Sequence, residues 1–211
     1  MKAKLLKWII PVMLIIPFGI FAQPIPAELM TGSKFGTFKL IVSKNFSESS
    51  KFGIFHINIL QFDYIRNSDN DLMLQDLLFY EPVKNFRITG GGLFTGKAGF
   101  LPTAGLQYKF TRKDALILLS PRVNFKDGSN EGDIIVITEY SPPLTDKINL
   151  FLGAQSLALF NRSGNIKCSQ DLRLGIGIKN MQFGLALGLE QIGTGYKSSH
   201  NAGLFIKRNI F

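Results

Sequence analysis

Cysteine and histidine are scarce in this 211-residue chain, and charged residues make up a small share of it. One cysteine, Cys168, excludes an intramolecular disulfide, and with only two histidines beside it we expect no metal site of the usual zinc kind and no cofactor. Charged residues account for 18% of the chain and hydrophobic residues for 45%. This balance is typical of a folded chain and argues against intrinsic disorder.

Long apolar runs are missing after the first 22 residues, so no later transmembrane helix is expected. Three lysines precede an apolar stretch from Trp8 to Ala22. A basic start, an apolar centre and a small final residue are the pattern of a secretory signal peptide. The stretch is shorter than the ~20 residues of a spanning helix. We therefore expect an exported protein cleaved after Ala22, with an uncleaved N-terminal anchor as the alternative.

Acidic residues are outnumbered, because 24 Lys and Arg stand against 15 Asp and Glu, for a formal net charge of +9. A surplus of this sign favours anionic lipid headgroups or acidic ligands without identifying either. The basic residues are scattered and form neither a basic run nor an RNA-binding signature. No nucleic-acid partner is therefore expected.

Apolar and polar residues alternate with period two along most of the chain, which is the signature of β-strands. Leu185 and Leu187, for example, share one face of a strand, opposite Gln182 and Glu190. Scattered glycines disfavour helix. Most candidate strands are longer than usual soluble strands and suit a tilted membrane crossing. They cover residues 35–46, 52–64, 86–95, 100–110, 115–125, 132–140, 147–160, 168–179, 181–190 and 201–211.

These strands predict an all-β fold, an antiparallel transmembrane β-barrel of about ten strands. An even number is what single-chain bacterial barrels require. Residues 71–80 form either a further strand or a short amphipathic helix, so eight and twelve strands stay open. The predicted domains are a signal peptide at 1–22, a periplasmic N-terminal segment at 23–34 and the barrel at 35–211. Short turns on one side and longer polar loops on the other, such as 191–200, are typical of outer-membrane barrels.

The whole chain resembles the small outer-membrane β-barrels of Gram-negative bacteria. The residues that carry the resemblance are the signal ending at 21–23, which resembles those of the Bacteroidota group, the amphipathic strands, and the terminal Phe211. The resemblance implies a place in the outer membrane among its lipid and lipopolysaccharide, and recognition of Phe211 by the barrel assembly machinery. Lys207 and Asn209 depart from the family pattern, in which apolar side chains occupy these positions.

The polar face of the strands supplies the candidate site residues. If the apolar face meets lipid, the polar face lines the lumen, where both signs of charge would form an ion-paired network or a narrow water path. So few strands leave little interior beyond what side chains fill, and no wide diffusion pore is expected. The predicted function is a non-enzymatic outer-membrane barrel, either structural or a narrow channel. The lumen-facing binding residues predicted are Lys109, Arg122, Glu139, Arg173 and Glu190.

Two other functions stay open. His200, with Ser198 or Ser199, would form the base and nucleophile of a hydrolase at the outer rim if the two side chains lie within hydrogen-bond reach. The other histidine, His56, is expected to face the lumen. A soluble periplasmic β-barrel that binds an apolar ligand would show the same alternation with its faces exchanged, because alternation alone does not distinguish inside from outside. The sequence does not indicate an oligomeric state.

Overall fold

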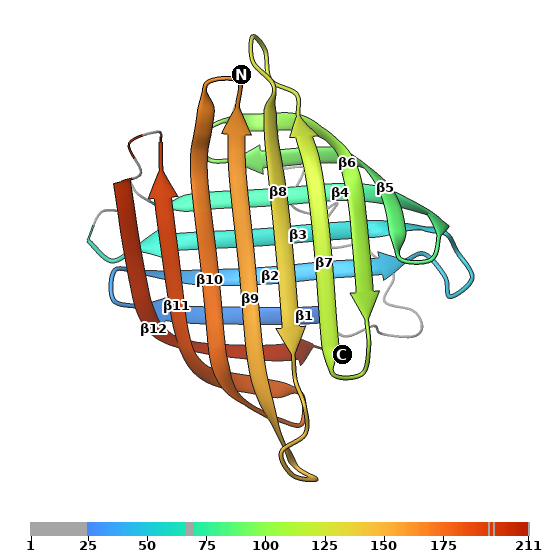
Figure 1. Ribbon diagram of the computed structural model, residues 1–211, viewed down its shortest axis with the longest axis vertical. Coiled ribbons are helices and arrows are strands. Elements are labelled where there is room, and N and C mark those ends of the chain that lie inside the picture. Colours follow the sequence, from blue (N-terminus) through green and yellow to red (C-terminus); the bar gives the residue numbers. More distant parts are fainter. Residues whose placement is uncertain (1–24, 66–69, 194, 196, 211) are drawn as a thin grey trace, which may run out of the picture.

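The computed structural model describes residues 25–65, 70–193, 195 and 197–210. Most of the segments in which apolar and polar residues alternate form β-strands in it. Each strand pairs antiparallel with the next, and β1 pairs with β12, so the sheet closes into a barrel (Figure 1). No helix within these described ranges is long and apolar enough to cross a membrane. The strands are β1 (Ile25–Gly32), β2 (Phe35–Asn45), β3 (Phe52–Asp63), β4 (Asp71–Val83), β5 (Phe86–Thr95), β6 (Gly99–Thr111), β7 (Ala115–Asn124), β8 (Glu131–Tyr140), β9 (Ile148–Asn161), β10 (Gly164–Ile178), β11 (Met181–Ile192) and β12 (Lys197–Ile210).

The strands tilt strongly against the barrel axis. Figure 1 shows β8 to β11 on one wall crossing β1 to β4 on the opposite wall, as expected when all strands of a barrel tilt in the same sense. Ile25 pairs with Ile210 in the closing ladder, so the first and last described strands meet at one end. We call this the terminal end, and the opposite end, which carries the turns after the odd-numbered strands, the distal end.

Within the described residues the barrel has twelve strands, which was one of the alternatives left open, and the expected ten omitted β1 and β4. The barrel begins at Ile25 and not at residue 35, because most of the expected periplasmic segment forms β1. Strand β1 contains Pro26 and completes its hydrogen bonds only by pairing with β12 at the far end of the sequence. Strand β4 has leucines on both faces, which hides the alternation. Residues 71–80 are therefore strand and not helix.

The connections do not show the expected contrast between short turns and long loops. At the distal end, residues 162–163 join β9 to β10 and residues 193–196 join β11 to β12. The expected loop at 191–200 is therefore largely strand. At the terminal end, residues 179–180 form the expected tight turn, but residues 141–147 form one of the longest connections. Long connections occur at both ends.

The outer surface of the barrel is apolar. In β7, Ile117, Leu119 and Val123 are exposed on the outside, whereas Ser120 and Arg122 are buried inside. The same alternation runs through the neighbouring strands β6 and β8. This arrangement is the reverse of a soluble barrel, which buries its apolar face.

The interior is filled differently on its two sides. Between β3, β4, β7 and β8, apolar side chains meet inside the barrel and close that part of the lumen. The wall formed by β1, β2 and β9 to β12 carries charged side chains around a smaller apolar cluster, Met30, Phe151, Ala186 and Phe205. The larger apolar cluster consists of Phe55, Ile57, Leu77, Phe79, Leu118, Ile135 and Ile137.

Candidate functional site in the barrel lumen

The five charged residues expected in the lumen do lie inside the barrel, on five different strands. They are Lys109 on β6, Arg122 on β7, Glu139 on β8, Arg173 on β10 and Glu190 on β11. The five do not gather in one site, although Glu139 and Arg173 line the same cavity. Each has its own polar partner. That they bind a solute stays a prediction.

Arg122 belongs to a polar network beside the larger apolar cluster. Its side chain and that of Asp133 are each 2% exposed, and its Nε lies 2.7 Å from Asp133 Oδ1. Its Nη1 contacts the amide oxygen of Gln75. Asn124 donates its Nδ2 to Asp133 Oδ2 at 2.6 Å and accepts a hydrogen bond from the Thr103 hydroxyl at 2.8 Å. Because both members of the pair are buried, removing either one alone would leave the other without its partner in the protein interior.

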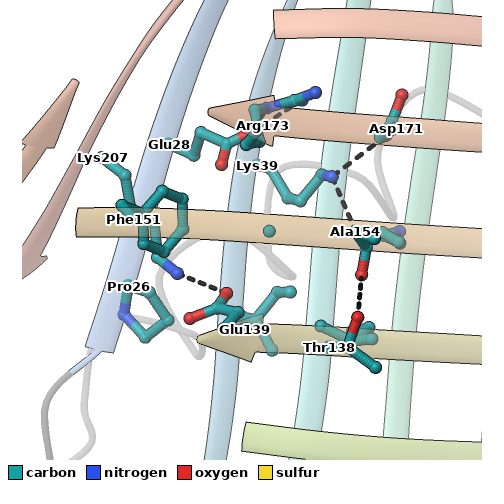
Figure 2. A pocket seen from close by; sticks show the side chains of 14 residues that line it. Pro26, Glu28, Lys39, Thr138, Glu139, Phe151, Ala154, Asp171, Arg173 and Lys207 are labelled. Atoms are coloured by element: carbon teal, nitrogen blue, oxygen red, sulfur yellow. Dashed lines mark hydrogen bonds and ion pairs between the residues drawn. The ribbon is translucent and has the colours of Figure 1, made fainter. Parts of the chain in front are cut away.

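A small cavity on the opposite side of the lumen is surrounded by three acidic and three basic side chains (Figure 2). Lys39 donates its Nζ to Gln155 at 2.7 Å and to Asp171 at 3.2 Å, across the barrel from β2 to β10. Equal numbers of opposite charges leave the cavity without a formal surplus of either sign. The six residues are Glu28, Lys39, Glu139, Asp171, Arg173 and Lys207.

Two more ion pairs complete the ring of charge around this cavity. Arg173 donates its Nη2 to Glu28 at 2.8 Å, and Lys207 forms an ion pair with Glu139. The Nζ of Lys207 also lies 5.1 Å from the ring centroid of Phe151, where a cation is attracted by the ring face. Each cation is thus held by a carboxylate, and Lys207 by an aromatic ring as well.

The small cavity is the middle one of three along this wall. It measures about 40 Å³, which is room for roughly three water molecules. A distal cavity of about 110 Å³ shares Lys39 and Asp171 with it. A terminal cavity of about 540 Å³ shares Glu139 and Lys207 with it. One ion pair therefore stands at each junction between neighbouring cavities.

Lys109 and Glu190 lie at opposite ends of this series. Lys109 lines the terminal cavity and donates its Nζ to the hydroxyl of Ser43 at 3.0 Å. Glu190 lines the distal cavity and pairs with Lys167. Two of the predicted residues thus line the outer cavities of the series, and two, Glu139 and Arg173, line the middle one.

Sequence reasoning did not select Glu28, Lys39, Asp171 or Lys207 as site residues. The pattern around Lys39, with Phe38 and Leu40 beside it, would have placed Lys39 inside. Lys207 stood out as a departure from the family pattern, and the structure explains it, because Lys207 is 5% exposed and points inward while Ile206 points outward. Asn209 follows the same inward alternation and lines the terminal cavity. The predicted role of Phe211 falls outside the described residues.

The geometry does not assemble the alternative hydrolase. His200 lies in β12 and not in a loop, and it faces outward, whereas Ser199 faces inward and accepts a hydrogen bond from Lys34 at 3.3 Å. Ser198 shares a face with His200 but lies two positions away, which is about 7 Å along an extended strand. His56 also faces outward and not into the lumen, because Phe55 and Ile57 on either side of it are buried inside. Among the residues that the structure describes, no cluster of His, Cys, Asp or Glu suits a metal ion.

Comparison with solved structures places the chain among porin-like barrels by its fold. The NanC porin superimposes with a TM-score of 0.54 at 12% identity, over 90% of this chain and 100% of the NanC chain. The KdgM porin gives a TM-score of 0.51 at 12% identity with the same coverage, both alone and in a complex with disordered oligogalacturonate. No family model matches the chain, and no curated protein matches its sequence. The similarity therefore concerns the fold, a closed antiparallel barrel of the porin type.

Proposed function

We propose that this protein is a non-enzymatic outer-membrane barrel that acts as a narrow channel for water and small ions. The observation that carries the proposal is the series of three cavities along one wall of the lumen, with an ion pair at each junction. The barrel would sit among outer-membrane lipid and lipopolysaccharide, in the orientation that places the terminal end in the periplasm.

The outer surface supports the membrane location. Aromatic rings pair on the outside near the terminal end, Phe52 with Tyr80 at 4.8 Å and Phe86 with Tyr108 at 5.1 Å between ring centroids. Phe62 lies near the distal end of the same strand as Phe52. The ten steps between them span ~33 Å along the strand and ~23 Å along the axis at a tilt of ~45°. That height matches the ~25 Å apolar band of outer-membrane barrels.

The interior supports a narrow path and not a wide pore. The larger apolar cluster closes one side of the lumen, and the middle cavity on the other side has room for only a few waters. Opposite charges in so small a space attract strongly, because little water screens them. Ion movement through the path therefore requires the Lys39–Asp171 and Lys207–Glu139 pairs to open.

Planar-bilayer recording of the purified protein tests the proposal. The wild-type protein should give no current, or small and infrequent steps with weak selectivity. The double variant Glu139→Gln, Asp171→Asn leaves Lys39, Arg173 and Lys207 with a single carboxylate among them, so its steps should be more frequent and selective for anions.

The control for this experiment carries the same change of charge outside the lumen. Glu48→Gln with Asp127→Asn alters two exposed loops, one at each end, and should leave the wild-type behaviour unchanged. Large, stable, weakly selective steps from the wild-type chain would refute the narrow path. Equal reversal potentials for the two double variants would show that ions do not pass the proposed pairs.

A further inference from the structure

A hydrogen-bonded histidine–aspartate pair lies on the outer surface of the barrel, in the middle of its apolar belt. His56 on β3 and Asp76 on β4 are direct cross-strand partners, and His56 Nδ1 lies 2.8 Å from Asp76 Oδ1. Both face outward, because their sequence neighbours Phe55, Ile57 and Leu77 are buried inside. The Asp76 side chain is 48% exposed and the His56 side chain 18%. The carboxylate is therefore accessible from outside the barrel.

The position of this pair along the barrel axis separates it from lipid headgroups. Towards the terminal end it is followed on the outer face by Leu78 and then Tyr80, and towards the distal end by Leu74 and Leu72. Apolar side chains thus lie on both sides of Asp76 along β4. The other ionisable Lys, Arg and His residues that point outward from the described strands, Lys44, His200 and Arg208, lie towards strand ends.

A charged pair facing hydrocarbon is unfavourable, and the penalty is greatest near the middle of the bilayer. Ionisable residues within a membrane-spanning region are therefore associated with partners or function. Nothing inside the lumen explains this pair, because both side chains point away from it. A polar partner supplied from outside would remove the unfavourable contact with lipid.

The surface beside Asp76 allows such a partner to approach closely. Asp76 pairs with Gly92, and Leu78 pairs with Gly90 on β5. A Cβ atom at Gly90 would meet nothing within 4 Å, whereas the ring of Phe100 covers Gly92, the direct partner of Asp76. Across β6, Ala104 pairs with Gly90 and continues the outward face with a short side chain. The outer wall is therefore low beside Leu78, the next outward residue along the strand from Asp76, as at membrane interfaces where small residues let backbones come together.

We propose that this face, His56 and Asp76 with the low surface over β5 and β6, is the interface with a second copy of the same chain. A two-fold axis along the membrane normal through the pair places His56 opposite the partner's Asp76 and Asp76 opposite the partner's His56. Each carboxylate then lies near two imidazoles. The proposal rests on the membrane location proposed above and goes beyond it, because it specifies the partner in the membrane.

Site-specific cross-linking in phospholipid vesicles tests the interface. In a Cys168→Ser background, Leu78→Cys places a thiol beside the two-fold axis, and Leu185→Cys on β11 places one on the other side of the barrel. The two leucines are matched, since they are 62% and 61% exposed. At low protein-to-lipid ratio, an oxidant should convert Leu78→Cys into a covalent dimer at least about tenfold faster than Leu185→Cys.

Variants of the histidine–aspartate pair distinguish this interface from chance collisions. Replacing both groups with leucine in the Leu78→Cys protein should lower cross-linking to the level of Leu185→Cys. Exchanging the two groups, His56→Asp with Asp76→His, keeps an imidazole opposite a carboxylate across the axis and should retain cross-linking. Folding of each variant is checked by the shift of its unheated band on a denaturing gel.

The outcomes separate the two proposals. A protein that inserts into vesicles but cross-links equally at both positions, or that remains monomeric by mass in nanodiscs, refutes the interface and leaves the membrane location intact. Retention of cross-linking in the double-leucine variant also refutes the role of the histidine–aspartate pair. A protein that folds in water and does not insert refutes both proposals.

Discussion

The buried Arg122–Asp133 pair offers the sharpest test of how the lumen is held closed. In Arg122→Met, Asp133 keeps its hydrogen bond from Asn124 but loses its cation, and the amide oxygen of Gln75 loses a donor. An uncompensated charge at such a buried site costs about 3–5 kcal/mol of folding free energy. Adding Asp133→Asn removes that charge and should recover most of the loss, because removing both members of a buried pair is far less costly than removing one.

The measurement is urea unfolding of the protein refolded into lipid vesicles, followed by far-UV circular dichroism and by the gel shift of unheated samples. Trp8 is the single tryptophan and lies in the expected signal peptide, so tryptophan fluorescence will not report on the mature barrel. Lys126→Met is the control, because its pair with Glu131 is exposed and such pairs contribute about 0–1 kcal/mol. The reasoning would be refuted if Arg122→Met lowered the free energy of unfolding no more than the control does. It would also be refuted if adding Asp133→Asn restored none of the free energy that Arg122→Met removes.

Two further expectations concern processing and the direction of the side chains. Intact mass of the exported protein should show cleavage after Ala22, and a mature chain that still contains Trp8 would contradict the signal-peptide assignment. Leu187→Arg should destabilise the barrel in vesicles by about 2–4 kcal/mol, since Leu187 faces outward in the apolar belt. Gly188→Arg should lower the stability less, because Gly188 faces inward and lines the distal cavity, which the carboxylates of Asp171 and Glu190 also line. Equal losses for the two variants would argue against a lipid-facing Leu187.

The sequence by itself determined all the strands but β1 and β4 and, for most of these, which residues point inward. In β7, alternation assigns Arg122 to the inside and Leu119 to the outside, and the structure agrees. This inference succeeds because side-chain direction in a strand follows from the local backbone, which repeats every two residues. It needs no knowledge of the neighbouring strands.

The same inference failed for His56, where only the tertiary structure decided the direction. Strands β3 and β4 place Phe55 and Leu77 inside a closed apolar cluster, so apolar residues occur on both faces and the polar His56 and Asp76 point outward. Alternation distinguishes two faces but does not say which one is inside. That depends on which side chains the other strands bring to the same part of the lumen.

Closure of the barrel and the pairing of its charges were also decided by tertiary structure alone. Strand β1 is short and contains Pro26, and it closes the barrel by pairing with both β2 and β12. Lys207 on β12 in turn forms an ion pair with Glu139 on β8 across the lumen. Such partners are set by the number, tilt and stagger of all the strands together. The local sequence determines which side chains share a face of a strand. The partner of each inward-facing side chain depends on the strands of the opposite wall of the barrel.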